Sequence, residues 1–205
     1  MTINLKNFLN TKPKISKMGE FQELKPIDGL EISSYSADLY KNGRDDIALF
    51  YFKEGANYAA LYTTNSITSQ TIEWNKKSNK SFTKGLLVNT KNANTFTGDN
   101  GLESIDVLAK NLSRILTIRE SKSDEGVSET VKIKDLLFAS TGVIGEKFPT
   151  EKIVLSLQSL VDKLRDDHNK LIWIKTASAI MTTDTKPKLS MAECKIGTSI
   201  VKIYG

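Results

Sequence analysis

The feature that most restricts how this chain can fold is residues 136–146, which have the sequence Leu-Leu-Phe-Ala-Ser-Thr-Gly-Val-Ile-Gly-Glu. The apolar start of this stretch predicts a short buried strand. The strand stops at Ser140, Thr141 and Gly142, small residues that allow the backbone to turn sharply and to expose its N–H groups. We therefore expect a strand end that presents hydrogen-bond donors.

Such a strand end can act as an oxyanion hole, a set of donors that stabilises an oxygen as it gains negative charge during acyl transfer. The candidate donors are the Gly142 N–H, which no Cβ shields, and the hydroxyl or N–H of Thr141. A bulkier residue at position 142 should then lower turnover by roughly 10²-fold or more while leaving folding largely intact. The alternative interpretation is an ordinary turn, because Ser, Thr and Gly favour turns.

Four other runs predict strands. They are rich in β-branched and aromatic residues or alternate apolar with polar positions, and they cover residues 47–52, 58–62, 85–89 and 196–204. The first should end at Glu54-Gly55 and pair with the second in a hairpin.

Two longer segments predict helices, because apolar residues recur at helical spacing. The first starts at Leu102, with Asn100 and Glu103 as a capping pair, and the second starts near Pro149 and reaches Leu164. Residues 171–174 fit either a strand or a helix, whereas residues 76–81 and 120–129 have loop composition. The alternation of strands and helices indicates an α+β fold.

The composition is that of an ordinary globular protein, with 39% hydrophobic and 26% charged residues in a chain of 205. We predict a single domain over residues 1–205, with residues 1–25 as an N-terminal arm. The net charge of +5 comes with lysines scattered among loops. A solvated basic surface explains that pattern better than a nucleic-acid partner, because no basic block is interleaved with exposed aromatic residues.

The rare residues restrict both compartment and chemistry. The only cysteine, Cys194, excludes an internal disulfide framework, and no apolar run approaches the roughly 18 residues of a membrane span. We expect a cytoplasmic protein without a signal peptide or a membrane partner. The only histidine, His168, lies in a charged run that resembles the polar end of a helix, which argues against an imidazole-based catalytic site and a His-rich metal site.

Polar clusters follow three apolar runs, at residues 89–94, 140–142 and 182–185. Their hydroxyl and amide side chains suit a cleft that holds a polar small molecule by hydrogen bonds. The alternative is that these residues simply form turns.

These clusters, with their neighbours, resemble the signature blocks of the ornithine acetyltransferase family, the ArgJ type of glutamate N-acetyltransferase. The resemblance runs from about residue 25 to the end of the chain, and its blocks are residues 44–49, 62–65, 84–89, 92–94, 97–98, 140–146, 179–185 and 187–188. One departure is Thr90-Lys91, where the family more often has Ser-Gly.

The resemblance implies a two-chain enzyme. Family members are precursors that cut themselves before a threonine, which becomes the N-terminal nucleophile of a β chain, so this sequence resembles the α chain. The implied fold is a layered αββα core of the N-terminal-nucleophile type, completed by the β chain, and the implied assembly is an α2β2 heterotetramer.

The implied reaction is acetyl transfer from N2-acetylornithine to glutamate, with ornithine released, in arginine biosynthesis. By resemblance, Thr141 and Gly142 stabilise the oxyanion and Thr182 binds the amino-acid substrate, whereas Asp184 is structural. The threonine's own α-amine can serve as the base, so no histidine is required. No metal or cofactor is implied, and acetyl-CoA is a second acetyl donor only if the enzyme is bifunctional.

Two alternatives remain open at this point. A self-cleaving aminopeptidase or amidase would share the oxyanion hole but would hydrolyse the acyl-enzyme. A non-catalytic basic binding module would have no companion chain and would bind polyanions in a salt-sensitive way.

Overall fold

The computed structural model describes residues 24–78, 81–123, 130–167 and 169–205. Most of the predicted N-terminal arm, part of the predicted loop at 120–129 and His168 lie outside these ranges, so the predictions that rest on them stay predictions. Among the described residues, no helix is both long and apolar enough to cross a bilayer.

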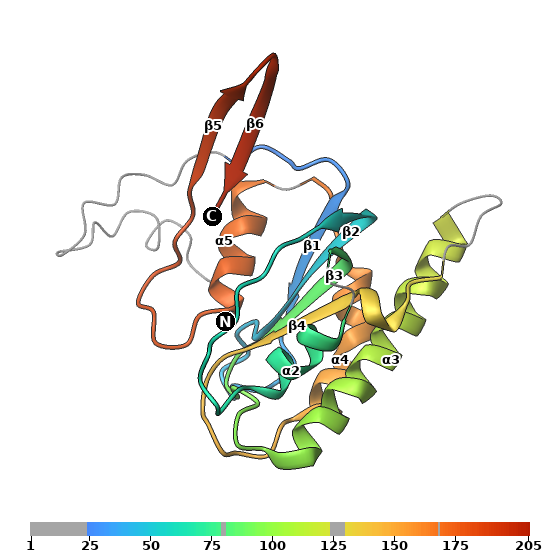
Figure 1. Ribbon diagram of the computed structural model, residues 1–205, viewed down its shortest axis with the longest axis vertical. Coiled ribbons are helices and arrows are strands. Elements are labelled where there is room, and N and C mark those ends of the chain that lie inside the picture. Colours follow the sequence, from blue (N-terminus) through green and yellow to red (C-terminus); the bar gives the residue numbers. More distant parts are fainter. Residues whose placement is uncertain (1–23, 79–80, 124–129, 168) are drawn as a thin grey trace.

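A four-stranded sheet forms the centre of the molecule, with the strand order β1-β2-β3-β4 (Figure 1). The first three strands are antiparallel neighbours, and β4 runs parallel to β3. The strands are β1 (Leu30–Tyr35), β2 (Ile47–Asn57), β3 (Phe82–Asn89) and β4 (Leu136–Ser140). The predicted strands at 47–52, 85–89 and 136–139 are therefore confirmed.

Strand β2 corrects one prediction, because it continues past Gly55 to Asn57, and residues 58–62 form no strand. Its pairing with β3 shifts register between Tyr51 and Ala56, which is a bulge. Gly55 has a φ of +76°, and a Cβ there would lie 2.0 Å from the ring of Phe82. The glycine bends the strand instead of ending it.

Two helices, α3 (Gly98–Ser123) and α4 (Thr150–Asp162), pack against each other and cover one face of the sheet. Their apolar stripes and the inward side chains of β2, β3 and β4 form the main core. Both helices were predicted. However, α3 begins four residues before Leu102, so Asn100 lies within the helix and the predicted capping pair is wrong. The helix also continues to Ser123, so the first four residues of the predicted loop 120–129 are helical.

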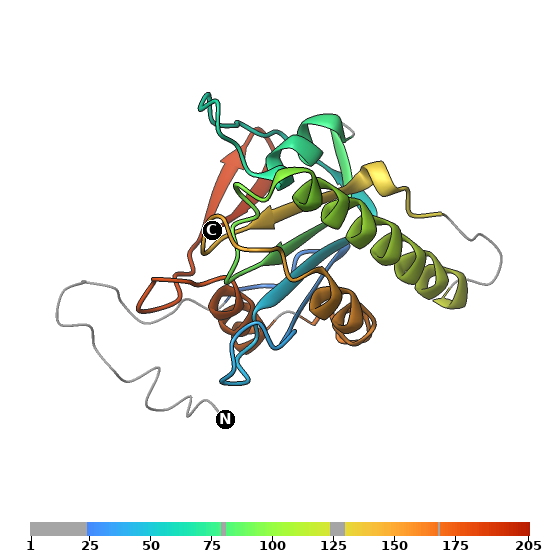
Figure 2. The same ribbon diagram turned by 90° about the horizontal axis from the view of Figure 1, so that it is seen from below.

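Helix α5 (Lys170–Ala179) contacts β1 and β2, and Figure 2 shows it apart from α4. Residues 171–174, which fitted either a strand or a helix, are therefore helical. Asn169 caps the start of this helix, because its side chain accepts hydrogen bonds from the N–H groups of Leu171 and Ile172. The Ser33 hydroxyl points to α4, donating to Leu160 O at 2.8 Å. Its neighbours in the strand therefore face α5.

Helix α2 (Gln70–Lys77) was not predicted, since Lys76 and Lys77 had been assigned to a loop. It covers the outer edge of β4. The Asn75 side chain bonds both the N–H and the C=O of Phe138, at 3.0 and 2.8 Å, and the Trp74 indole N–H donates to Leu136 O at 3.0 Å. These bonds satisfy an edge that would otherwise be unpaired.

The chain ends in a separate two-stranded sheet, β5 (Met191–Ile196) and β6 (Ser199–Tyr204). One strand over 196–204 had been predicted. The turn at Gly197, with a φ of +61°, instead divides this region into a hairpin.

Candidate functional site

The loops that follow β3 and β4 leave the sheet side by side. The parallel register pairs Asn89 with Ser140, the last residues of the two strands, and the Ser140 hydroxyl donates to Asn89 Oδ1 at 2.6 Å. An isolated bridge between Asn92 and Val143 continues this pairing into the loops. The polar clusters at 89–94 and 140–142 therefore form one structural unit.

Buried amide side chains hold this unit together. Asn89 and Asn92 are only 4% and 3% exposed. Asn89 Nδ2 donates to Asn92 O at 3.0 Å, and Asn92 Nδ2 donates to Glu146 O at 3.0 Å. Asn92 Oδ1 accepts from Asn94 N at 2.8 Å. Because these donors and acceptors are satisfied within the loops, the backbone around Gly142 is fixed before any ligand binds.

Gly142 is where the two loops touch backbone to backbone. Its φ is +137°, and a Cβ would lie 2.2 Å from the carbonyl carbon of Lys91. The Val143 N–H donates to Lys91 O at 2.9 Å across this contact. Any side chain at position 142 must push the loops apart, which corrects the expectation that a substitution there would leave folding largely intact.

Lys91 has a φ of +74°, a left-handed conformation that costs a non-glycine residue roughly 1 kcal/mol or more. The glycine that the resemblance led us to expect at this position would not have this cost. The Lys91 ammonium lies 5.5 Å from the centre of the Tyr40 ring. The backbone at Lys91 thus has a conformation that a glycine adopts without strain.

The three candidate donors at the turn are not equivalent. The Thr141 N–H donates to Asn89 O at 3.1 Å, so it is engaged in the fold. Within the described ranges, neither the Thr141 hydroxyl nor the Gly142 N–H has a hydrogen-bond partner. Thr141 is half-buried and Gly142 is exposed. The structure thus leaves two donors free, the Thr141 hydroxyl and the Gly142 N–H.

Thr182 lies in the loop after α5, and Arg44 anchors that loop to the sheet. The Arg44 guanidinium donates to Ser178 O at 2.9 Å and to Met181 O at 2.7 Å, and it stacks over Tyr40 at 4.6 Å. Figures 1 and 2 both show this loop on the side of the sheet where β3 and β4 end. Thr182 itself is half-buried.

Asp46 joins the Arg44 turn to the β3 loop. Its fully buried carboxylate accepts from the N–H groups of Ala37 and Leu39, each at 2.7 Å, while its carbonyl accepts from the N–H and the hydroxyl of Thr90, each at 3.0 Å. Burial raises the pKa of Asp46, although the backbone N–H donors oppose the shift. This aspartate is a structural anchor for both loops.

Arg44, Asp46 and Asn89 thus link Thr182 with the turn at Thr141 and Gly142, although no direct hydrogen bond joins Thr182 to that turn in the described chain. Asp184 is exposed and forms an ion pair with Lys188, which lowers the pKa of Asp184. The expected structural role of Asp184 stays a prediction. No role was predicted for Arg44, although it lies in a recognised block, and Asn89 of the predicted polar cluster bonds the loops to each other.

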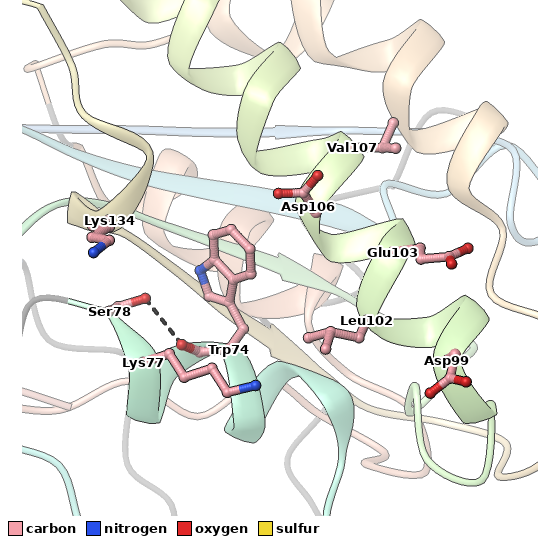
Figure 3. A pocket seen from close by; sticks show the side chains of 9 residues that line it. All are labelled: Trp74, Lys77, Ser78, Asp99, Leu102, Glu103, Asp106, Val107 and Lys134. Atoms are coloured by element: carbon pink, nitrogen blue, oxygen red, sulfur yellow. Dashed lines mark hydrogen bonds between the residues drawn. The ribbon is translucent and has the colours of Figure 1, made fainter.

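A hollow of about 710 Å³ lies elsewhere, between α2 and α3 (Figure 3). Carboxylates of α3 line one side and lysines line the other, with Trp74 between them; its lining residues are Trp74, Lys77, Ser78, Asp99, Leu102, Glu103, Asp106, Val107 and Lys134. None of the predicted site residues lines it. No group of three or more potential metal ligands (His, Cys, Asp or Glu) occurs among the described residues.

The fold and the turn define a class: an α+β protein in which two hydrogen-bond donors, unpaired within the described chain, follow the last strand of the sheet, where two parallel strands end. The ArgJ family model matches residues 31–205. The arginine biosynthesis bifunctional protein ArgJ of Gluconobacter oxydans is 32% identical over 184 residues, covering 89% of this chain and 39% of its own length. The corresponding protein of Caulobacter vibrioides is 32% identical, with coverages of 90% and 43%. This chain belongs to the ArgJ family.

Solved structures agree on the fold. ArgJ from Bacillus halodurans superposes with a TM-score of 0.74 at 20% identity, covering 90% of this chain and 92% of that chain. Ornithine acetyltransferase from Mycobacterium tuberculosis, solved with ornithine, superposes with a TM-score of 0.73 at 19% identity, with coverages of 90% and 93%. The chain spans about two fifths of the length of the curated relatives it matches.

Proposed function

We propose that this chain is the α part of an ornithine acetyltransferase, which moves the acetyl group of N2-acetylornithine to glutamate in cytoplasmic arginine biosynthesis. Family membership supports the proposal, as does the name that the curated relatives share. The observation that carries it is the pair of free donors, the Thr141 hydroxyl and the Gly142 N–H, at one rigid turn.

The nucleophile in this proposal belongs to a β chain, which autocatalytic cleavage of a common precursor releases with an N-terminal threonine. Its α-amine takes the proton of the threonine hydroxyl as the oxygen attacks the acetyl carbonyl of N2-acetylornithine. The carbonyl oxygen becomes an oxyanion and accepts hydrogen bonds from Thr141 and Gly142. Each well-placed donor contributes about 3–4 kcal/mol to lowering the barrier.

Collapse of this intermediate releases ornithine, whose amine takes the proton from the threonine α-amine, and leaves an acetyl ester on the threonine. Glutamate then attacks the ester through its amine, which gives a proton to the threonine α-amine, and the same two donors stabilise the second oxyanion. Its collapse breaks the ester C–O bond and releases N-acetylglutamate, and the threonine oxygen takes the proton back from the α-amine. This is a ping-pong cycle that needs no metal or resident cofactor, and an imidazole is not required. Acetyl-CoA would enter only as an alternative donor in the first step.

The amino-acid end of the substrate is assigned to the Thr182 loop. Thr182 supplies a hydroxyl that can accept or donate a hydrogen bond, and Arg44 fixes the loop by bonding Met181 O and Ser178 O. Arg44 is a positioning residue in this account.

The β chain also completes the layered αββα core of an α2β2 heterotetramer in this proposal. Leu86, Val88 and Ala139 lie on the sheet face opposite α3 and α4, and all three are only half-buried. A second sheet packed on that face would bury them.

The test uses the purified enzyme with acetyl-labelled N2-acetylornithine and glutamate, together with an intact mass spectrum. We expect labelled N-acetylglutamate and a second polypeptide that begins with threonine. Release of labelled acetate alone would identify an amidase instead, and the absence of a second chain would refute the proposal. A parallel reaction with acetyl-CoA and glutamate shows whether the thioester is also a donor.

A further inference from the structure

The β5–β6 hairpin has two unlike faces. Directly opposed residues of an antiparallel pair share a face. The cross-strand pairs Ala192–Ile203, Cys194–Val201 and Ile196–Ser199 therefore form one face, which carries no charge. The pairs Met191–Tyr204, Glu193–Lys202 and Lys195–Ile200 form the other, which carries all three charged residues of the hairpin.

The charged face is the one that contacts the rest of the chain. Glu193 pairs with Lys25 at 3.3 Å, and the Tyr204 ring stacks on Trp173 of α5 with centroids 5.9 Å apart. Two backbone hydrogen bonds between Ser190 and Gly205 close the base of the hairpin. Figure 1 shows the hairpin extending beyond α5. The uncharged face is therefore directed away from the contacts that attach the hairpin.

That uncharged face is exposed. Ile196, Val201 and Ile203 are 64%, 37% and 55% exposed, and the Cys194 thiol is exposed as well. Ile200, near the tip of the charged face, is also exposed. A strand pair with one uncharged and one charged face has the pattern of an element that is buried on one side, and a lone two-stranded hairpin is marginally stable in water.

We propose that the β chain covers the uncharged face of this hairpin, through Cys194, Ile196, Val201 and Ile203. The inference rests on the proposed function, which supplies the β chain. The curated relatives have more than half of their length outside the region matched here, so enough polypeptide exists to cover the face. The six residues of the uncharged face are too few for a stable contact between two copies, which needs roughly 20–30 residues a side. They suit the margin of a larger interface.

The experiment measures thiol accessibility in the assembled enzyme. Native protein is treated with a maleimide, and the labelled peptides are identified by mass spectrometry. The matched control is a Cys194→Ser, Lys195→Cys variant, which moves the thiol by one residue to the charged face. We expect Cys194 to react at least roughly tenfold more slowly than the control thiol, and to react fully after denaturation, because a covered thiol is inaccessible to the reagent.

A photo-crosslinking amino acid at position 203 identifies what covers the face, with position 202 as its control. A product with the summed mass of the two chains supports the proposal. A product of two copies of this chain, or no product at position 203, overturns it.

The acetyl-transfer assay on the same samples separates the two proposals. If Cys194 reacts as fast as the control thiol in an enzyme that transfers acetyl groups, the hairpin inference is wrong and the proposed function stands. If Cys194 is protected by the β chain and labelled acetate is the only product, the proposed function is wrong and the hairpin inference stands.

Discussion

The sharpest test of the oxyanion hole is Thr141→Val. The substitution replaces a hydroxyl by a methyl group and keeps the β-branched shape that suits the end of a strand. The Thr141 N–H remains on Asn89 O, and no hydrogen bond to another described residue is lost, because the hydroxyl has no partner there. The free energy of unfolding should therefore change by no more than about 0.5 kcal/mol.

The kinetic effect should be far larger. The variant removes one of two donors to an oxygen that becomes charged only in the transition state, so kcat should fall by roughly 10² to 10³, or about 2.7–4 kcal/mol. The KM for N2-acetylornithine should change much less, since the neutral carbonyl of the bound substrate gains little from the donor. Thr141→Ser keeps the hydroxyl and should retain most of the activity.

The measurements are kcat and KM with each substrate varied in turn, and urea unfolding of both variants. Loss of the donor should slow both half-reactions, because the same oxyanion forms in each. If Thr141→Val has the kcat and the stability of the wild type, the unpaired Thr141 hydroxyl is not a donor to the oxyanion.

Three further substitutions test other parts of the site. Gly142→Ala places a Cβ against the backbone of Lys91. It should lower the free energy of unfolding by at least about 2 kcal/mol and should also lower kcat. A variant as stable in urea as the wild type would contradict the close contact. Arg44→Lys removes the planar guanidinium that bonds both Met181 O and Ser178 O. The KM for the amino-acid substrates should therefore rise roughly tenfold, with kcat less affected. Initial-rate kinetics in which kcat alone falls would argue against a positioning role. Asp46→Asn leaves one carbonyl oxygen to serve the N–H groups of Ala37 and Leu39 and should cost about 1–3 kcal/mol by urea unfolding, while unchanged stability would refute its role as an anchor.

Periodicity and apolar runs predicted the central strands and the two long helices, because these elements bury a continuous stripe or face. Helix α2 was missed for a physical reason. Its last turn carries Lys76 and Lys77 and is followed by loop-like residues, and the helix is stabilised by the bonds of Asn75 and Trp74 to β4, which no local pattern reveals. Gly55 and Gly197 misled the prediction in opposite ways, since one continues a strand through a bulge and the other divides one.

The position of the turn at Thr141 and Gly142 could be predicted from small residues after a strand, but the state of its donors could not. The N–H of Thr141 is engaged by Asn89, a residue more than 50 positions away, through the parallel pairing of β3 and β4. Arg44 acts on carbonyls 134 and 137 positions away. Contacts of this kind depend on tertiary structure. The polar clusters and the family resemblance indicated that these segments belong to one site, but not which groups would be engaged.

The in-register pairing of Asn89 with Ser140 has a consequence for engineering. The segments after these residues are matched to each other in length, since the bridge from Asn92 to Val143 holds only while each advances by the same number of residues. An insertion in either segment alone would move the Gly142 N–H away from the position of the proposed oxyanion. Loop exchange between relatives should therefore move residues 89–98 and 140–148 as a pair, and a chimaera that carries one without the other should fold around the same helices yet lose its turnover.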